Sequence, residues 1–250
     1  MLQAIVSDIH ANLEALAAVL RDIEKHGAQD IICLGDVIGY GPNPLECVDV
    51  AKEFRLTLLG NHEEAVLNLM RARGFNPKAS AAVRWTADQF DILADRKKNG
   101  PRWDFMGGLK DTYSADAILC VHGSPIDHTR GYIYASDAQN PRKMIRVFKE
   151  IDHLCIVGHT HVPGLWTSDL TFQSPEELGF KYTIDGRKTI INVGSVGQPR
   201  DMDNRSCYAL FDGRQIVWRK VPYAYHAVAR KIFAIPELDN FLGHRLKEGR

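Results

Sequence analysis

The feature that most constrains the fold is a short apolar run, residues 30–34, that ends in a glycine and a carboxylate. The segment 33–41 reads C-L-G-D-V-I-G-Y-G, so a buried strand delivers Asp36 to the edge of a sheet. Open α/β sheets bind ligands at such strand ends. The glycines at 35, 39 and 41 suit a loop that turns tightly and passes close to a ligand. We therefore expect Asp36 to lie at the centre of a ligand site.

Two further units of the same kind flank this segment. The run 2–6 leads into Asp8 and His10, and Asn12 is an N-cap candidate for a helix that continues to about residue 26. The run 56–59 ends in Gly60-Asn61-His62-Glu63 and follows a helix expected over 44–54. Three repeats of strand, polar loop and helix predict a mostly parallel sheet with its loops gathered at one end.

The pattern is helical from residue 64 to about residue 99, with a break near 74–77. Trp85, Gln89 and Ile92 lie along one expected face of this region. The region carries no cluster of ligand-type residues, so we expect helices that pack on the sheet or cap its loops. We expect a single domain, 1–250, with a helical insertion at about 64–100.

The second half of the chain is rich in predicted strands. The run 118–121 ends in His122-Gly123, the run 154–157 ends in Gly158-His159-Thr160-His161, and another strand is expected over 188–193. Runs at 206–211 and 215–221 flank Asp212-Gly213, and a second Asp-Gly pair at 185–186 suggests another hairpin. We expect these strands to form a second sheet, packed face to face with the first, with helices outside both.

Composition excludes several classes of function. Acidic and basic residues balance at 31 each, so the chain has no global basic field of the kind that general nucleic-acid or anionic-membrane binding uses. No run approaches the roughly 18 apolar residues of a membrane span, and the first residues show no signal-peptide pattern. The five cysteines lack a C-x-x-C spacing, and three of them lie inside apolar runs, which predicts small buried hydrophobes. We expect a cytoplasmic protein with no membrane partner and no sequence-specific nucleic-acid partner, and its oligomeric state is left open.

Residues of metal-ligating type gather in the loops after the predicted strands. In the two D-x-H and H-x-H pairs, an extended backbone would point both side chains to the same face. Imidazole with carboxylate and one amide oxygen suits manganese, iron, zinc, nickel or cobalt, whereas calcium prefers mostly oxygens. The set is too large for one ion that keeps an open position, and it suits two ions that share a carboxylate. Its members are Asp8, His10, Asp36, Asn61, His62, His122, His159 and His161.

Taken in order, these motifs resemble those of the calcineurin-like metallophosphoesterases. The family pattern D-x-H, G-D-x-x-x-x-G, G-N-H-E, H-G and G-H-x-H matches segments 8–10, 35–41, 60–63, 122–123 and 158–161. The segment 192–200, N-V-G-S-V-G-Q-P-R, looks like the closing strand of the smaller bacterial and archaeal members. The resemblance implies a four-layer α/β/β/α sandwich of two mixed sheets, with two divalent metal ions, manganese foremost, at the strand ends.

The resemblance also implies a role for each matching residue. His62 would not ligate; it would face the scissile ester and protonate the leaving alkoxide or stabilise its charge. A hydroxide on the two ions would attack phosphorus directly, since such ions lower the pKa of bound water to about 7. The implied ligands are Asp8, His10 and His161 for the first metal, Asn61, His122 and His159 for the second, and Asp36 as the bridge between them.

Departures from the family pattern bear on the substrate. Tyr40 stands where the serine/threonine phosphatases of the superfamily carry a phosphate-binding arginine, which argues against a phosphoprotein phosphatase. Ala11 replaces a glycine common in short bacterial members, a mild change. Asn12 and Arg200 are candidate phosphate contacts, with an N-cap and a surface ion pair as their respective alternatives. The loop 124–136, which contains Arg130 and two tyrosines, either stacks on a nucleobase or packs on the edge of the sandwich.

These patterns leave three hypotheses for the function. The first is a two-metal phosphodiesterase with some phosphomonoesterase activity that acts on a small phosphate ester or a nucleotide, in its narrower form a dinucleoside polyphosphate hydrolase. The second is a non-catalytic metal-binding scaffold, which would be free to lose ligands or His62, although this chain has all of them. The third is a DNA exonuclease subunit, which a neutral chain without a basic track disfavours.

Overall fold

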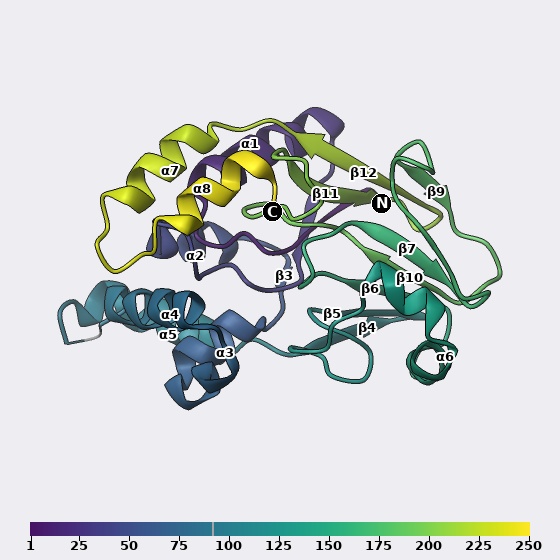
Figure 1. Ribbon diagram of the computed structural model, residues 1–250, viewed down its shortest axis with the longest axis horizontal. Helices are drawn as coiled ribbons and strands as arrows, with labels where there is room; N and C mark the ends of the chain where they lie inside the picture. Colours follow the sequence, from purple (N-terminus) through teal and green to yellow (C-terminus); the bar gives the residue numbers. More distant parts are fainter. Residues whose placement is uncertain (92) are drawn as a thin grey trace.

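The computed structural model describes residues 1–91 and 93–250, so Ile92 and its expected place on a helix face lie outside the described residues. The described chain forms two six-stranded sheets (Figure 1). The first sheet runs in the order β3 (Leu56–Thr57), β2 (Asp30–Cys33), β1 (Gln3–Val6), β11 (Ser206–Phe211), β12 (Gln215–Val221) and β9 (Lys181–Thr183). The second runs in the order β4 (Thr112–Ala115), β5 (Ile118–Val121), β6 (Leu154–Val157), β10 (Thr189–Asn192), β7 (Gly164–Thr167) and β8 (Thr171–Gln173).

Strands β1, β2 and β3 are parallel, as the repeated strand and helix pattern predicts. Helices α1 (Leu13–His26) and α2 (Pro44–Ala51) make the crossovers between them. The other edge of β1 pairs with β11 in antiparallel fashion, and β11 and β12 form the hairpin expected around Asp212-Gly213. Both sheets are therefore mixed.

Two expectations about the second half of the chain were wrong. Strands β9, β11 and β12 belong to the first sheet, because the edge of β1 opposite β2 takes up β11 and the hairpin extends from there. Asp185-Gly186 also does not close a hairpin: β9 pairs with β12, whereas β10 pairs with β6 and β7, so this turn crosses from one sheet to the other. Asp185 Oδ1 accepts a hydrogen bond from Arg187 N at 2.9 Å within the turn.

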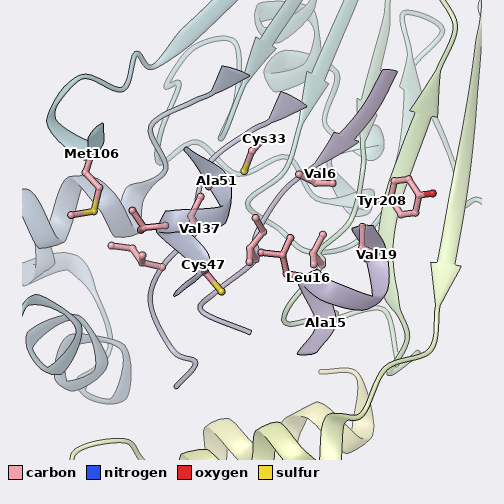
Figure 2. Packing of buried hydrophobic residues seen from close by; sticks show 14 of the residues in the cluster. Val6, Ala15, Leu16, Val19, Cys33, Val37, Cys47, Ala51, Met106 and Tyr208 are labelled. Atoms are coloured by element: carbon pink, nitrogen blue, oxygen red, sulfur yellow. The ribbon is translucent and has the colours of Figure 1, made fainter. Parts of the chain in front are cut away.

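Alternate residues of β1 face opposite sides of the first sheet, as strand geometry requires. Ala4 and Val6 pack against helix α1, whereas Ile5 packs between the two sheets. Figure 2 shows Leu16 and Val19 of α1 close to Val6, in the outer core cluster. The first sheet thus separates an outer core under helices from an inner core shared with the second sheet.

The second sheet is covered on its outer face by α6 (Pro141–Lys149), which follows a short 3₁₀ helix (Ala135–Gln139). Met144 and Val147 of α6 pack with Val157 and Ile190, which gives the fourth layer of the sandwich (Figure 1). Between the sheets, the buried Trp218 donates a hydrogen bond from Nε1 to the carbonyl of β10 residue 192 at 2.9 Å and so ties one sheet to the other. The expected α/β/β/α architecture is confirmed.

The remaining helices lie near the loop end of the sheets. They are α3 (Asn61–Leu67), a 3₁₀ helix (Leu69–Gly74), α4 (Pro77–Gln89), α5 (Arg96–Gly107), α7 (Tyr225–Phe233) and α8 (Phe241–Glu248). Helix α5 continues beyond the expected end near residue 99. Ala82 of α4 belongs to the same apolar cluster as Val228 of α7 and Leu242 and Leu246 of α8, so the C-terminal tail packs against the helical insertion.

None of the described helices has the length and apolar character needed to cross a membrane. The five cysteines all lie in the described part of the chain and are buried with free thiols, which agrees with their expected role as small hydrophobes. Burial raises the pKa of the Cys33, Cys120 and Cys207 thiols, so at neutral pH these groups are uncharged.

Replacement of Leu16 by alanine tests the outer core. Leu16 is fully buried, so Leu16→Ala should lower the free energy of unfolding by about 2–5 kcal/mol, measured by urea denaturation. Leu93→Ala is the matched control, because Leu93 is 96% exposed, and it should change stability by less than about 0.5 kcal/mol. Equal effects of the two substitutions would contradict the assigned packing.

Candidate metal centre

The structure brings all eight predicted ligand-type residues to one edge of the sandwich. They follow the carboxyl ends of β1, β2 and β3 in the first sheet and of β5 and β6 in the second. Every one of them is at most 6% exposed. Three overlapping groups have ligand atoms close enough to hold an ion: Asp8, His10 and His161; His10, Asp36 and His62; Asp36, His122 and His159.

The first group presents two imidazole nitrogens and a carboxylate oxygen to one point. His10 Nε2 lies 3.1 Å from His161 Nε2, and Asp8 Oδ1 lies 3.2 Å from His161 Nε2. The other ring nitrogens face main-chain carbonyls, with Nδ1 of His10 3.1 Å from the Ile38 oxygen and Nδ1 of His161 2.6 Å from the Gln198 oxygen. A carbonyl only accepts, so each Nδ1 carries the proton and each Nε2 presents a lone pair.

The group formed by Asp36, His122 and His159, which we call the second group, converges together with Asn61 on Nε2 of His122. This atom lies 3.2 Å from Asn61 Oδ1, 3.1 Å from His159 Nδ1 and 3.3 Å from Asp36 Oδ2. Asp36 Oδ2 is also 3.7 Å from His10 Nε2 in the first group. One carboxylate oxygen therefore stands between the two groups.

The donor set fits a pair of divalent cations. Although burial disfavours their charge, neighbouring histidines hold the pKa values of Asp8 and Asp36 below the usual range, so both carboxylates are ionised. Asp8 Oδ1 is fully buried and has no hydrogen-bond donor among the described residues. A buried anionic oxygen of this kind needs a compensating positive charge. The buried clusters are thus consistent with a binuclear metal site.

Most of the imidazoles are neutral, as metal ligands must be. Burial lowers the pKa of His10 and of His161, and burial together with His122 lowers the pKa of His159 to about 3. His122 differs: burial opposes its charge, but Asp36 outweighs burial and raises the pKa of His122 to about 9.

The backbone around the ligands is strained. We expected an extended backbone in the D-x-H and H-x-H pairs, but φ is positive at Asp8 (54°), His10 (48°), His159 (64°) and His161 (62°). Asp36 also has positive φ, at 53°. Such conformations are unfavourable for residues with a Cβ, and strain of this kind gathers at functional sites. The close turn of the D-x-H loop directs Asp8 and His10 to the same ligand group, whereas the turn of the H-x-H loop places His161 in that group and His159 in the other. The expectation that each pair grips one ion therefore holds for the first pair alone.

Glu63, for which the sequence suggested no role, supports the Asp36 loop. Its buried carboxylate accepts hydrogen bonds from Asp36 N at 2.8 Å, Ile38 N at 3.0 Å and Gly60 N at 3.0 Å. It thereby joins the loop after β2 to the start of α3. The signal available in the sequence was its place in G-N-H-E, one residue after His62.

The segment after β10 supports the ligands of both sheets, a role that its sequence did not reveal. Asn192 donates from Nδ2 to the Gly158 carbonyl at 2.6 Å and to Thr160 Oγ1 at 2.9 Å, which holds the H-x-H loop. Ser195 donates from Oγ to the Asp8 carbonyl at 2.9 Å. The second sheet is thereby linked to the D-x-H loop of the first.

His62 is buried beside the ligand groups. Its main-chain N–H donates to Asp36 Oδ1 at 2.9 Å. Its ring centroid is 4.9 Å from that of His10, 4.5 Å from that of Tyr40 and 5.0 Å from that of Phe75. Burial lowers the pKa of His62 to about 4, so the ring is neutral at pH 7 and retains one N–H.

The two candidate substrate contacts have different surroundings. Asn12 is 1% exposed, and its side chain caps α1 by accepting from Ala15 N at 3.0 Å and donates to the Gly197 carbonyl at 2.8 Å. Both of its polar atoms are therefore engaged within the protein. Arg200 is half-buried, donates from Nη2 to Gln198 Oε1 at 2.7 Å and lies 6.0 Å from the centre of the Tyr40 ring.

The loop 124–136 divides into two parts. Arg130 pairs with Glu64 Oε2 at 2.7 Å, so it is tied to α3. Tyr132 packs on the ring of His159 at 4.0 Å, and Tyr134 stacks on Tyr132 at 5.3 Å, with exposed fractions of 41% and 50%. The expected packing is observed for Tyr132, on the ring of His159, and both tyrosines are exposed to solvent; stacking on a nucleobase stays a prediction.

The pH dependence of metal affinity tests the protonation state of His122. With its pKa raised to about 9, His122 is protonated at pH 7, and a cation beside Nε2 must displace that proton. We expect Mn²⁺ affinity, measured by calorimetry, to rise with pH between 6 and 9 by up to about tenfold per pH unit. An Mn²⁺ affinity that is independent of pH across this range would show that binding displaces no proton from His122.

Comparisons with known proteins agree with this geometry. The model of the calcineurin-like phosphoesterase superfamily domain matches residues 1–215. An uncharacterized protein of Methanocaldococcus jannaschii is 34% identical over 251 residues, which cover 99% of this chain and 98% of that protein.

Two crystal structures share the whole fold. A metallophosphoesterase from Sphaerobacter thermophilus is 33% identical with a TM-score of 0.85, and the match covers 100% of this chain and 99% of that one. A hypothetical protein from Pyrococcus horikoshii is 17% identical with a TM-score of 0.76, covers 100% and 98% of the two chains, and is similar in fold alone. The chain belongs to the calcineurin-like phosphoesterase superfamily, whose members are metal-dependent phosphoesterases.

Proposed function

We propose that the protein is a two-metal phosphodiesterase with some phosphomonoesterase activity. The observation that carries the proposal is the position of Asp36 Oδ2 between two convergent ligand groups, 3.3 Å from His122 Nε2 and 3.7 Å from His10 Nε2. The ligands of the two ions are those that the motifs imply: Asp8, His10 and His161; Asn61, His122 and His159; and the bridging Asp36.

Two divalent ions held there, manganese foremost and iron, zinc, nickel or cobalt as alternatives, supply Lewis acidity and a water of lowered pKa. The protein buries the ligand side chains and restricts their orientation. The carbonyls beside Nδ1 of His10 and His161 hold their rings in one tautomer, and Glu63 holds the loop that carries Asp36. Because these contacts fix the ligand side chains, the ions and a substrate bound to them would be held in a constant orientation.

His62 is the catalytic residue in this proposal. It is neutral at pH 7, because burial lowers its pKa to about 4, so it acts by donating its remaining N–H to the leaving oxygen. Hydrogen bonding of this kind stabilises charge as it develops on the alkoxide. Full proton transfer from an imidazolium would need a pKa closer to the working pH.

The substrate in this proposal is a small phosphate ester or a nucleotide. The exposed Tyr132–Tyr134 stack beside His159 favours the narrower candidate, a dinucleoside polyphosphate hydrolase, because a base can stack on either ring. The five free thiols suit a reducing compartment and support the cytoplasm as the location.

Metal dependence is the first test of the proposal. Metal-stripped protein should not hydrolyse bis-p-nitrophenyl phosphate, and resupply of Mn²⁺ should restore turnover of this diester above that of p-nitrophenyl phosphate. Metal uptake without turnover of either ester would favour the scaffold hypothesis instead.

Substitution of His62 separates catalysis from metal binding. His62→Ala should lower kcat for the diester by roughly 10²- to 10⁴-fold while metal content, measured by atomic absorption, stays unchanged. Asp36→Asn should lose both turnover and bound metal. His26→Ala is the matched histidine control, because His26 is an exposed residue on α1, and it should retain the rate. Loss of metal in His62→Ala would make that residue a ligand.

A further inference from the structure

A cleft of about 560 Å³ adjoins the metal centre. Its near wall is formed by Tyr40, Tyr132 and Arg200, and its far wall by the first residues of α4 and by Phe241 and Arg245 of α8. Helices α4 and α8, which carry no metal ligand, thus line this cleft. A volume of this size accommodates a group as large as a nucleoside phosphate.

The cleft lies on the side of the site where His62 stands. Tyr40 belongs to its wall, and the Tyr40 ring lies 4.5 Å from the ring of His62 and 4.7 Å from that of His10. Tyr40 therefore contacts the cleft and both of these histidine rings, so the cleft and the metal centre adjoin at this residue. The other tyrosine of the wall, Tyr132, packs on the ligand His159 from a different direction.

Two arginines in the wall have no Asp or Glu side chain as a partner in the described part of the chain. Among the described residues, no Asp or Glu side chain lies within ion-pair distance of Arg200 or Arg245. Nε of Arg200 is buried and has no hydrogen-bond acceptor in the described chain. Nε of Arg245 donates to the main-chain oxygen of Arg250. Burial, and then repulsion from Arg200, lower the pKa of Arg245 to about 10, and both guanidinium groups lie in the lining of the same cleft.

The rest of the cleft wall combines a charged side chain with apolar ones. Lys78 has an acidic partner, Asp239, at 3.2 Å, and lies 4.4 Å from the centre of the Phe241 ring. Phe241 is 39% exposed and Leu242 is buried beside it. The orphaned guanidinium nitrogen of Arg200 and the arginine at position 245 favour an occupant with an anionic part, and the exposed Phe241 ring favours an apolar or aromatic part.

We propose that this cleft binds the leaving-group half of the substrate and that Arg200 and Arg245 bind a second phosphate carried on it. The inference rests on the proposed function and narrows its substrate class to esters or anhydrides with at least two phosphate groups. Guanidinium groups bind phosphate by paired, charge-assisted hydrogen bonds, which suits them to this task.

Binding of ADP and of AMP, measured by calorimetry on the manganese-loaded protein with free Mn²⁺ held constant, tests the inference. The natural protein should bind ADP about tenfold more tightly than AMP, since a charge-assisted contact contributes about 1.5–3 kcal/mol. Arg245→Met should bring this ratio close to one. Lys247→Met, an exposed position on the same helix, is the matched control and should keep the ratio.

A second variant keeps the test valid if the Arg245→Met protein misfolds. Arg200→Gln should also lower the ratio, and thermal melting checks both variants. A ratio near one in the natural protein, or a ratio unchanged in both arginine variants, would overturn the second-phosphate site even if diesters are hydrolysed. An arginine-dependent preference for ADP in a protein that hydrolyses no ester would support the site and overturn the proposed function.

Discussion

The rest of this structure depends on the burial of two ionised carboxylates, Asp8 and Asp36, among imidazoles. Buried negative charge is costly unless a cation or several donors compensate it. The chain meets this cost with strained loops that place the ligands, with Glu63 behind Asp36, and with carbonyls that set the tautomers of His10 and His161. None of these arrangements improves the packing of the sandwich. They hold in place carboxylates and imidazoles whose clusters are consistent with a binuclear metal site.

The metal centre requires both sheets of the sandwich, because its ligands follow strands of each. Two of the three ligand groups draw from both sheets: Asp8 follows a strand of the first sheet and meets His161 of the second, and Asp36 meets His122 in the same way. The contacts between the layers are therefore part of the site. Trp218 bonded to the Asn192 carbonyl in the core, and Ser195 bonded to the Asp8 carbonyl at the edge, set the distance between the two halves. The geometry of the metal centre is thus coupled to the packing of the whole fold.

The ligand positions were predictable because they follow from local rules. A buried strand that ends in Gly-Asp or Gly-His places that side chain at the sheet edge whatever the rest of the chain does. The sheet to which β9, β11 and β12 belong was not predictable in this way. Alternation of apolar and polar residues along a strand tells which of its faces is buried, but it does not tell which strand lies next to it. The support from Glu63 and Asn192 was also hidden, since a carboxylate or amide that bonds main-chain groups far along the chain leaves no spacing signal.

The metal-ligand clusters and the neighbouring cleft are built by different parts of this chain. The ligands lie at strand ends, where their positions follow from the sheets, whereas the cleft beside them is lined by α4 and α8, which belong to the helical insertion and the C-terminal tail. These helices pack on each other through Ala82, Leu242 and Leu246. Substitutions in them can reshape the cleft without moving a metal ligand. Arg245 lies in the cleft wall and on none of the loops that carry the ligand clusters, so the shape of the cleft and the geometry of the clusters depend on different elements.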